Sequence, residues 1–334
     1  MSNIRFRITA GTDVGLVRSN NEDNFILNAD LTRPDWYVPQ DTSKIQKLGD
    51  EGCVLVVADG MGGLNAGEVA SAIAVEQVQQ EFLNADIKKV ACTEKKIENF
   101  LFEIIDKADI AIKQRVNDDP STKGMGTTII LAWIIGNKVH LAWCGDSRAY
   151  IFNKSSGLRR ISKDHSYVQQ LVDAGKIDEE SAFNHPNSNI ITRCLGDYRG
   201  KANPEYRSYT LSQGDNVMLC TDGLCGLCRD EKILETFNTY SEDIETCKQQ
   251  LINEALNAGG YDNVTIALFE ATEIDDVVNV GSTAEISSSS SQKSINKSKV
   301  TKIAILIAVA AIILLILNNR PEILEYIKNL LDNK

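Results

Sequence analysis

Four pairs of residues, each containing a carboxylate, stand at the ends of short apolar stretches of this sequence. They are Glu22-Asp23, Asp59-Gly60, Asp222-Gly223 and Asp262-Asn263. The apolar stretches are short and rich in valine and isoleucine, which is typical of buried strands. A buried carboxylate is costly unless a positive charge compensates it. Carboxylates gathered from distant parts of one chain would repel one another unless hard divalent cations lie among them. We therefore expect one metal-binding cluster.

The stretch around Asp59 is the most informative of the four. Six apolar or small residues at 53–58 lead into Asp59, and Gly60 follows it. We expect Gly60 to let the backbone turn sharply and to leave its carbonyl oxygen unobstructed. Gly62 and Gly63 keep the region bare, so that a substrate could approach the backbone. A single Asp-Gly pair is explained equally well as a simple turn, but four acidic sites in this order are not.

The charge of the chain argues against nucleic acid as its main partner. The 334 residues carry a net charge of -11, but the last 54 residues hold seven Lys or Arg and four Asp or Glu. The first 280 residues therefore carry a net charge of -14. Nucleic-acid binding needs a basic face, whereas an acidic domain fits a carboxylate-rich metal site or an ordinary solvated surface.

The eight cysteines are predicted to be reduced. Several lie in apolar strands, and we see no secretory signal at the N-terminus, so they are interpreted as small buried hydrophobic residues. Cys225 and Cys228 form a CxxC pair, but no second pair of ligands accompanies it. We therefore expect a structural role for this pair and no zinc.

The hydrophobic periodicity predicts an α+β fold. Strands are expected at 4–10, 24–27, 53–58, 125–135, 139–144, 149–152, 206–211, 216–221 and 263–270, and helices at 65–82, 94–116, 163–174, 230–238 and 242–257. Consecutive strands with helices in separate groups indicate antiparallel sheets with helices packed outside.

Six short motifs, in this order, resemble the metal-dependent protein phosphatases, the protein phosphatase 2C family in its bacterial form. They span 18–23, 59–63, 124–128, 145–148, 221–223 and 262–263, within a resemblance that covers roughly residues 5–270. The resemblance implies an α/β/β/α sandwich of two antiparallel sheets flanked by helices. It also implies a centre of two Mg²⁺ or Mn²⁺ ions and hydrolysis of phosphoserine and phosphothreonine by an activated water.

The resemblance assigns roles to particular residues. Asp59 would bridge both ions and the Gly60 carbonyl would add a ligand, while Asp222 and Asp262 would hold one ion. Neighbouring side chains on an extended strand point to opposite faces, so Glu22 and Asp23 cannot easily bind the same ion. We expect Glu22 to reach the ions or their waters and Asp23 to orient other ligands. Asp146, together with Asp222, corresponds to a weaker third metal site, although Asp146 could also simply bond its own turn.

Arg18 is the candidate for gripping the substrate phosphate, because a guanidinium binds two phosphate oxygens in a fork. The alternative is a surface salt bridge. Animal members of the family have a histidine just after the Asp-Gly pair, where this chain has Met61. The histidines present are His140, His165 and His185, and we assign none of them as a general acid.

The C-terminal part is predicted to anchor the enzyme in the cell membrane. We divide the chain into a catalytic domain at 1–272, a flexible Ser/Lys-rich linker at 273–302, a transmembrane helix at 303–319 and a short amphipathic tail at 320–334. Fifteen uninterrupted apolar residues at 303–317 favour a span, and the lysines before it place the catalytic domain in the cytoplasm.

The leading interpretation is thus a single-pass, membrane-anchored protein serine/threonine phosphatase. Its expected partners are phosphorylated proteins, including a serine/threonine kinase, and the membrane, with no nucleic acid. Two alternatives stay open at this point: a catalytically weak, membrane-tethered phosphoprotein-binding module, and a phosphoesterase for small molecules that uses the same metal site.

Overall fold

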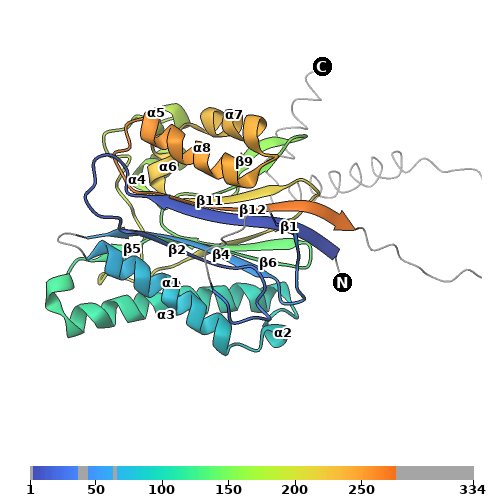
Figure 1. The fold of residues 1–334 in the computed structure, drawn as a ribbon. Coiled ribbons are helices and arrows are strands. Elements are labelled where there is room, and N and C mark those ends of the chain that lie inside the picture. The colour runs from blue at the N-terminus through green and yellow to red at the C-terminus, as the bar shows by residue number, and fades with distance from the viewer. Residues whose placement is uncertain (1–2, 37–43, 63–65, 276–334) are drawn as a thin grey trace, which may run out of the picture. The chain divides into compact units, whose positions relative to one another are not determined.

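Two antiparallel β-sheets lie face to face in the middle of the molecule, and helices cover their outer sides (Figure 1). The computed structural model describes residues 3–36, 44–62 and 66–275, which belong to one compact unit. The predicted α+β sandwich of two antiparallel sheets flanked by helices is confirmed for this part of the chain.

The first sheet has six strands. In spatial order they are β3 (Gln46–Lys47), β1 (Asn3–Asp13), β12 (Val264–Asp275), β11 (Asn216–Cys220), β8 (Arg148–Asn153) and β9 (Gly157–Arg160). The short helices α4 (Tyr167–Asp173), α5 (Glu179–Phe183) and α6 (Asp222–Cys225) and the longer α7 (Asp230–Tyr240) and α8 (Ile244–Asn257) lie on its side of the sandwich (Figure 1).

The second sheet follows the order β10 (Glu205–Thr210), β7 (Lys138–Cys144), β6 (Ile129–Ile135), β4 (Cys53–Met61) and β2 (Asp23–Asn28), and β5 (Gly126–Thr127) pairs with β4 beyond the end of β6. Its outer face is covered by α1 (Gly67–Asn84), α2 (Ile87–Val90) and α3 (Glu94–Asp118), after which η1 (Pro120–Thr122) leads into β5.

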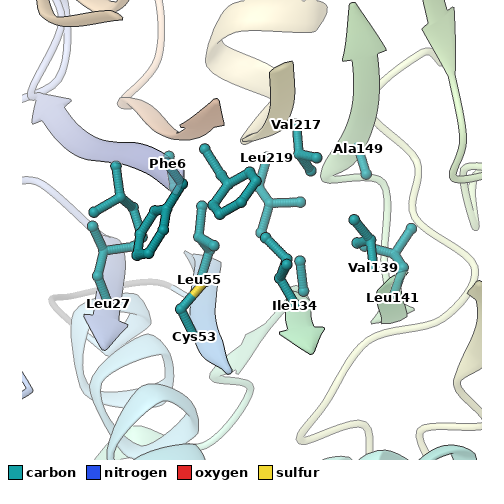
Figure 2. Close-up of a cluster of buried hydrophobic side chains, with 14 of the residues drawn as sticks. Phe6, Leu27, Cys53, Leu55, Ile134, Val139, Leu141, Ala149, Val217 and Leu219 are labelled. Carbon is teal, nitrogen blue, oxygen red and sulfur yellow. The ribbon is translucent and has the colours of Figure 1, made fainter. Parts of the chain in front are cut away.

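Strand β4 is buried on both faces, which explains its uninterrupted apolar sequence. Because side chains alternate along a strand, Leu55 points into the space between the sheets, whereas Val54 and Val56 pack under the helices. Figure 2 shows Leu55 among side chains of both sheets, including Phe6 of β1 and Leu219 of β11. The core between the sheets thereby fixes β4 against β11, and both strands lead toward carboxylates.

Several predicted elements differ from the observed ones. Strand β4 continues through Asp59 to Met61, where we expected a turn, because β5 and β2 both pair with this end of it. Asp222 begins the short helix α6, which the periodicity did not predict. The helix predicted at 163–174 begins only at Tyr167, and the strand predicted at 125–135 is interrupted at Thr128.

The C-terminal predictions fall mostly outside the described residues. Strand β12 continues to Asp275, past the domain boundary predicted at 272. The rest of the linker, the transmembrane helix predicted at 303–319 and the tail at 320–334 lie outside the described residues. Within residues 3–36, 44–62 and 66–275, no helix is long and apolar enough to cross a membrane.

Candidate metal centre

Asp59 lies in the second sheet, near the end of a strand that neighbours hold on both sides. It is opposite Asp23 in the pairing of β2 with β4. The Asp59 amide donates a 3.1 Å hydrogen bond to Thr128 Oγ1, and its carbonyl oxygen accepts one of 2.8 Å from Thr127 Oγ1. The backbone that carries the Asp59 carboxylate is therefore fixed before any ligand arrives.

Two glycines next to site aspartates are required by close backbone contacts rather than by turns. A Cβ on Gly60 would lie 2.2 Å from the carbonyl oxygen of Gly67, where α1 begins. A Cβ on Gly223 would lie 1.8 Å from the carbonyl oxygen of Asn263. The expectation that Gly60 turns the backbone was wrong, because Gly60 is part of β4 and pairs with Thr127. Its small size instead lets the start of α1 approach the site.

The first sheet contributes the other carboxylates. Asp222 follows β11, Asp262 precedes β12, and Asp146 lies in the connection between β7 and β8. Since β8, β11 and β12 are neighbours in this sheet, their ends bring the three residues to one place. Thr221 Oγ1 donates a 2.9 Å hydrogen bond to Asp23 Oδ2, which connects this group to the second sheet.

The electrostatics show that these carboxylates share one environment. Burial, followed by the charge of Asp222, holds the pKa of both Asp59 and Asp146 well above the ordinary value. Burial also raises the pKa of Asp23 to about 7, although hydrogen bonds from Thr265 and Thr221 oppose it. The pKa of Asp222 is raised by burial and then by Asp262. Such a group is unfavourable when ionised unless cations neutralise it.

The donor atoms fit hard divalent cations. They are carboxylate oxygens and backbone carbonyls, which suit Mg²⁺ or Mn²⁺ better than Zn²⁺. Asp146 Oδ1 is buried without a hydrogen-bond partner, as expected for an oxygen that awaits a ligand. In the described part of the chain, no group of three or more His, Cys, Asp or Glu side chains is arranged to hold an ion as it stands. The residues therefore suit these cations because of the chemical type of their donor atoms and because they converge at one place.

Glu22 and Asp23 point in different directions, as their adjacency on an extended segment requires. Glu22 lies toward α1, because a Cβ on Gly67 would come within 2.7 Å of Glu22 Cδ. Burial, partly offset by Arg18, raises the pKa of Glu22. Asp23, only 8% exposed, turns instead toward Thr221, which directly follows β11 of the other sheet.

Arg18 is half-exposed and forms an ion pair with Asp262, at 2.8 Å between Nη2 and Oδ2. A salt bridge was the alternative to phosphate binding for Arg18, and the structure contains one. The partner of Arg18 in it is Asp262, one of the carboxylates of the site. Asn263 holds this segment in place. Its side chain donates to the carbonyl oxygens of Val14 and Asn20, each at 2.9 Å, and accepts from the Glu22 amide at 2.8 Å.

The three histidines occupy different surroundings. His140 Nδ1 lies 2.7 Å from the Tyr206 hydroxyl on neighbouring strands, and His185 is half-buried and accepts a bond from the Asn187 amide. His165 is buried and accepts a 3.1 Å hydrogen bond from the Gly145 amide, next to Asp146. Burial lowers the pKa of His165, which favours the neutral ring that this bond needs.

Sequence reasoning missed two contacts that hold the Asp146 loop. One is the bond between His165 and Gly145, and the other is a two-pronged ion pair between Arg148 and Asp164 with distances of 2.7–3.1 Å. The adjacent Asp164 and His165 were a usable signal, because a buried polar pair needs partners. Cys225 and Cys228 pack in the apolar layer between the first sheet and α7 and α8.

A cleft of about 840 Å³ opens beside these residues. Asp146, Asp222 and Asp262 line it together with Tyr261 and the irregular segment that contains α4 and α5. It is large enough for a phosphorylated side chain and part of its polypeptide.

The fold is that of a known class. The profile of the Protein phosphatase 2C family matches residues 37–258, and the chain belongs to that family. It is a metal-dependent serine/threonine protein phosphatase of the bacterial type.

Individual relatives agree. The chain is 32% identical over 262 residues to serine/threonine phosphatase stp of Listeria monocytogenes, which covers 78% of this chain and 93% of that protein. The crystal structure of the serine/threonine phosphatase PstP/Ppp of Mycobacterium tuberculosis has a TM-score of 0.65 and 31% identity, covering 81% of this chain and 100% of that one. A PstP catalytic domain solved with two manganese ions has a TM-score of 0.64 and 30% identity, and the match covers 82% of this chain and 100% of that one.

Proposed function

We propose that this phosphatase uses carboxylates in and beside the cleft to bind two Mn²⁺ or Mg²⁺ ions. Asp59 would bridge the ions and the Gly60 carbonyl would add a ligand, while Asp222 and Asp262 would complete the site of one ion. The observation that carries the proposal is that Asp146, Asp222 and Asp262 lie at adjoining ends of β8, β11 and β12, and that the bond from Thr221 to Asp23 brings them next to the strand pair that holds Asp59.

The remaining acidic residues would have supporting roles. Glu22 would reach the ions from the side of α1, and Asp23 would orient Asp222 through Thr221, to which it is bonded at 2.9 Å. Asp146 and Asp222 would hold a weaker third ion. The buried Asp146 Oδ1 without a hydrogen-bond partner supports that role.

The chemistry follows from these ligands. Two such ions, when bound, lower the pKa of a water molecule and neutralise charge on the phosphoryl group. Arg18 would exchange its bond to Asp262 for a forked contact with the substrate phosphate, because an ion there would compete for that carboxylate. Asp59, Asp222 and Arg18 are thus the residues we assign to catalysis. His165 is engaged with Gly145, so we assign it to positioning the loop.

The decisive experiment measures phosphate release from a phosphothreonine peptide with and without Mn²⁺, together with calorimetric Mn²⁺ binding. Asp59→Asn and Asp222→Asn should each lose roughly three powers of ten in kcat, since positioned ions supply several kcal/mol of charge stabilisation. Both should also bind Mn²⁺ more weakly. Glu103→Gln on α3, whose side chain is 61% exposed, serves as the matched control. Near-normal turnover in either aspartate variant would refute the assignment.

The same assay separates the other activities. A phosphoesterase for small molecules would hydrolyse p-nitrophenyl phosphate but leave phosphopeptides intact. A phosphoprotein-binding module would bind the peptide without releasing phosphate. We propose phosphorylated proteins, including a serine/threonine kinase, as the natural substrates, which fits the relatives that are described as serine/threonine phosphatases.

We also propose that the chain is anchored in the membrane by residues 303–319, with the catalytic domain in the cytoplasm. The support is the sequence alone: fifteen apolar residues at 303–317, preceded by Lys293, Lys297, Lys299 and Lys302. An anchor of this kind would keep the phosphatase near membrane-bound phosphoproteins.

A further inference from the structure

Exposed apolar side chains gather on two neighbouring loops, one of which reaches the cleft through Tyr261. Eleven large hydrophobic residues are exposed in the described part of the chain, and four of them belong to these loops. They are Val14, Leu16, Val17 and Tyr261, with exposed fractions of 37%, 68%, 64% and 62%. We call these four residues the apolar rim. Exposed apolar side chains that are scattered singly need no explanation, but a group at the edge of a binding site does.

The loops of the apolar rim are held in one conformation. The Leu16 amide donates a 2.7 Å hydrogen bond to the Gly260 carbonyl, and Asn263 Nδ2 holds the Val14 carbonyl at 2.9 Å. Gly15 has a positive φ of 80°, and a Cβ there would lie 2.4 Å from the Asp262 carbonyl oxygen. A surface fixed in this way loses little conformational entropy when it binds a partner.

The apolar rim is continuous with the catalytic site. Val17 directly precedes Arg18, and Tyr261 directly precedes Asp262, the two residues joined by the 2.8 Å ion pair. Tyr261 also lines the cleft itself. Val17 and Tyr261 are thus available to contact a polypeptide whose phosphorylated residue reaches Arg18 and Asp262.

We propose that the apolar rim binds the polypeptide of the phosphoprotein substrate, and that it accepts an apolar side chain close in sequence to the phosphorylated serine or threonine. This inference rests on the proposed function of the cleft. Its physical basis is the burial of apolar surface on both partners, which a polar flanking residue cannot provide. The rim thus selects among phosphoproteins, whereas the ions and Arg18 act on the phosphate that all of them share.

The first test uses one phosphothreonine peptide whose flanking positions carry leucine, serine or aspartate in turn. With the full-length wild-type protein and Mn²⁺, leucine at one or more positions within three residues of the phosphothreonine should raise kcat/KM about three- to tenfold over serine. An equal kcat/KM for leucine and serine at every position would overturn the proposal.

The second test locates the preference on the rim. In Leu16→Ser and Val17→Ser, the ratio of kcat/KM for the leucine peptide to that for the serine peptide should fall toward one. Ile110→Ser is the matched control, because Ile110 is also 64% exposed but belongs to α3, which covers the outer face of the second sheet. This control should keep the wild-type ratio. A ratio that is unchanged in both rim variants, or that falls equally in Ile110→Ser, would overturn the proposal.

The two proposals fail in different ways. Hydrolysis of p-nitrophenyl phosphate in the presence of Mn²⁺ reports the catalytic centre without a polypeptide. If wild-type protein hydrolyses neither this compound nor any of the phosphopeptides, the proposed function fails. If the activity is present but the peptides show no dependence on their flanking residues, only the role of the apolar rim fails.

Discussion

Thr221 Oγ1 donates a 2.9 Å hydrogen bond to Asp23 Oδ2, and this bond joins the two sheets at the candidate metal centre. The same hydroxyl accepts a 3.0 Å bond from the Thr265 amide. Thr221 is completely buried and immediately precedes Asp222. Its hydroxyl therefore fixes the position of a proposed metal ligand relative to the opposite sheet.

Replacing Thr221 tests this relationship. Thr221→Val keeps the shape but removes the donor to Asp23 and the acceptor for the Thr265 amide, so it should lower the free energy of unfolding by about 1–3 kcal/mol. It should also weaken Mn²⁺ binding, because Asp222 loses its support. Urea unfolding and calorimetry measure the two effects. Thr221→Ser retains the hydroxyl and should behave nearly as wild type; equal losses in both variants would assign the effect to packing.

Repulsion between the clustered carboxylates should lower the free energy of unfolding of the metal-free protein. Asp59→Asn removes one charge from the cluster and should raise the free energy of unfolding in chelator, on the order of 1 kcal/mol. Mn²⁺ at a hundred times its Kd should add about 2.7 kcal/mol to the wild type and much less to the variant. Thermal unfolding with chelator and with Mn²⁺ measures both. A variant less stable than wild type in chelator would contradict this account.

Much of this centre was predictable from the types and order of its residues. Aspartates at the ends of apolar strands predicted a cluster, and the motifs around Asp59 and Asp222 identified a family and a fold that are now confirmed. The ligand roles of these residues remain predictions. The position of Asp23 opposite Asp59 follows from strand register, which the hydrophobic pattern constrains.

The remaining features depend on contacts between distant segments, which local patterns do not contain. Gly60 looked like a turn residue because the approach of the Gly67 carbonyl is a tertiary contact. The bond from Gly145 to His165 and the ion pair of Arg148 with Asp164 cross a gap of sixteen residues or more. Short elements such as α6 and β9 were missed because four residues are too few to show a period.

Stability should fall with rising pH in the metal-free protein. The folded-state pKa of Asp23 is about 7, far above that of an unfolded aspartate, so the folded state binds the extra proton between these values. The contribution of protonated Asp23 to stability is therefore fully present below about pH 4 and is lost as the pH rises through about 7. Asp59, Asp146 and Asp222 shift in the same direction.

Urea unfolding in chelator at pH 5 and pH 8 measures this dependence, and the midpoint should be lower at pH 8. Asp23→Asn should flatten the dependence without abolishing it, since three other carboxylates contribute. Mn²⁺ should oppose the trend, because its ligands must lose their protons to bind. A midpoint that rises between pH 5 and pH 8 in chelator would contradict the shared environment of these carboxylates.

Membrane association tests the proposal for residues 303–319. The full chain should sediment with membranes and resist extraction by high salt or carbonate, because a span is held by apolar burial rather than by charge. A chain of residues 1–285, which contains every described element, should remain in the supernatant and be active. A reporter fused after Lys334 should report the far side of the membrane. A cytoplasmic reporter would contradict a single span.

Replacing Arg18 distinguishes a guanidinium that binds substrate from one that only forms a structural ion pair. If Arg18 binds phosphate, Arg18→Ala should raise KM about ten- to a hundredfold with a smaller change in kcat, because a charge-assisted bond is worth about 1.5–3 kcal/mol. Arg18→Lys should recover only part of the loss, since an ammonium cannot form the fork. Because the side chain is 48% exposed, the pair with Asp262 alone should contribute at most about 1 kcal/mol to stability. Unchanged kinetics together with a small loss of stability would assign Arg18 to the salt bridge alone.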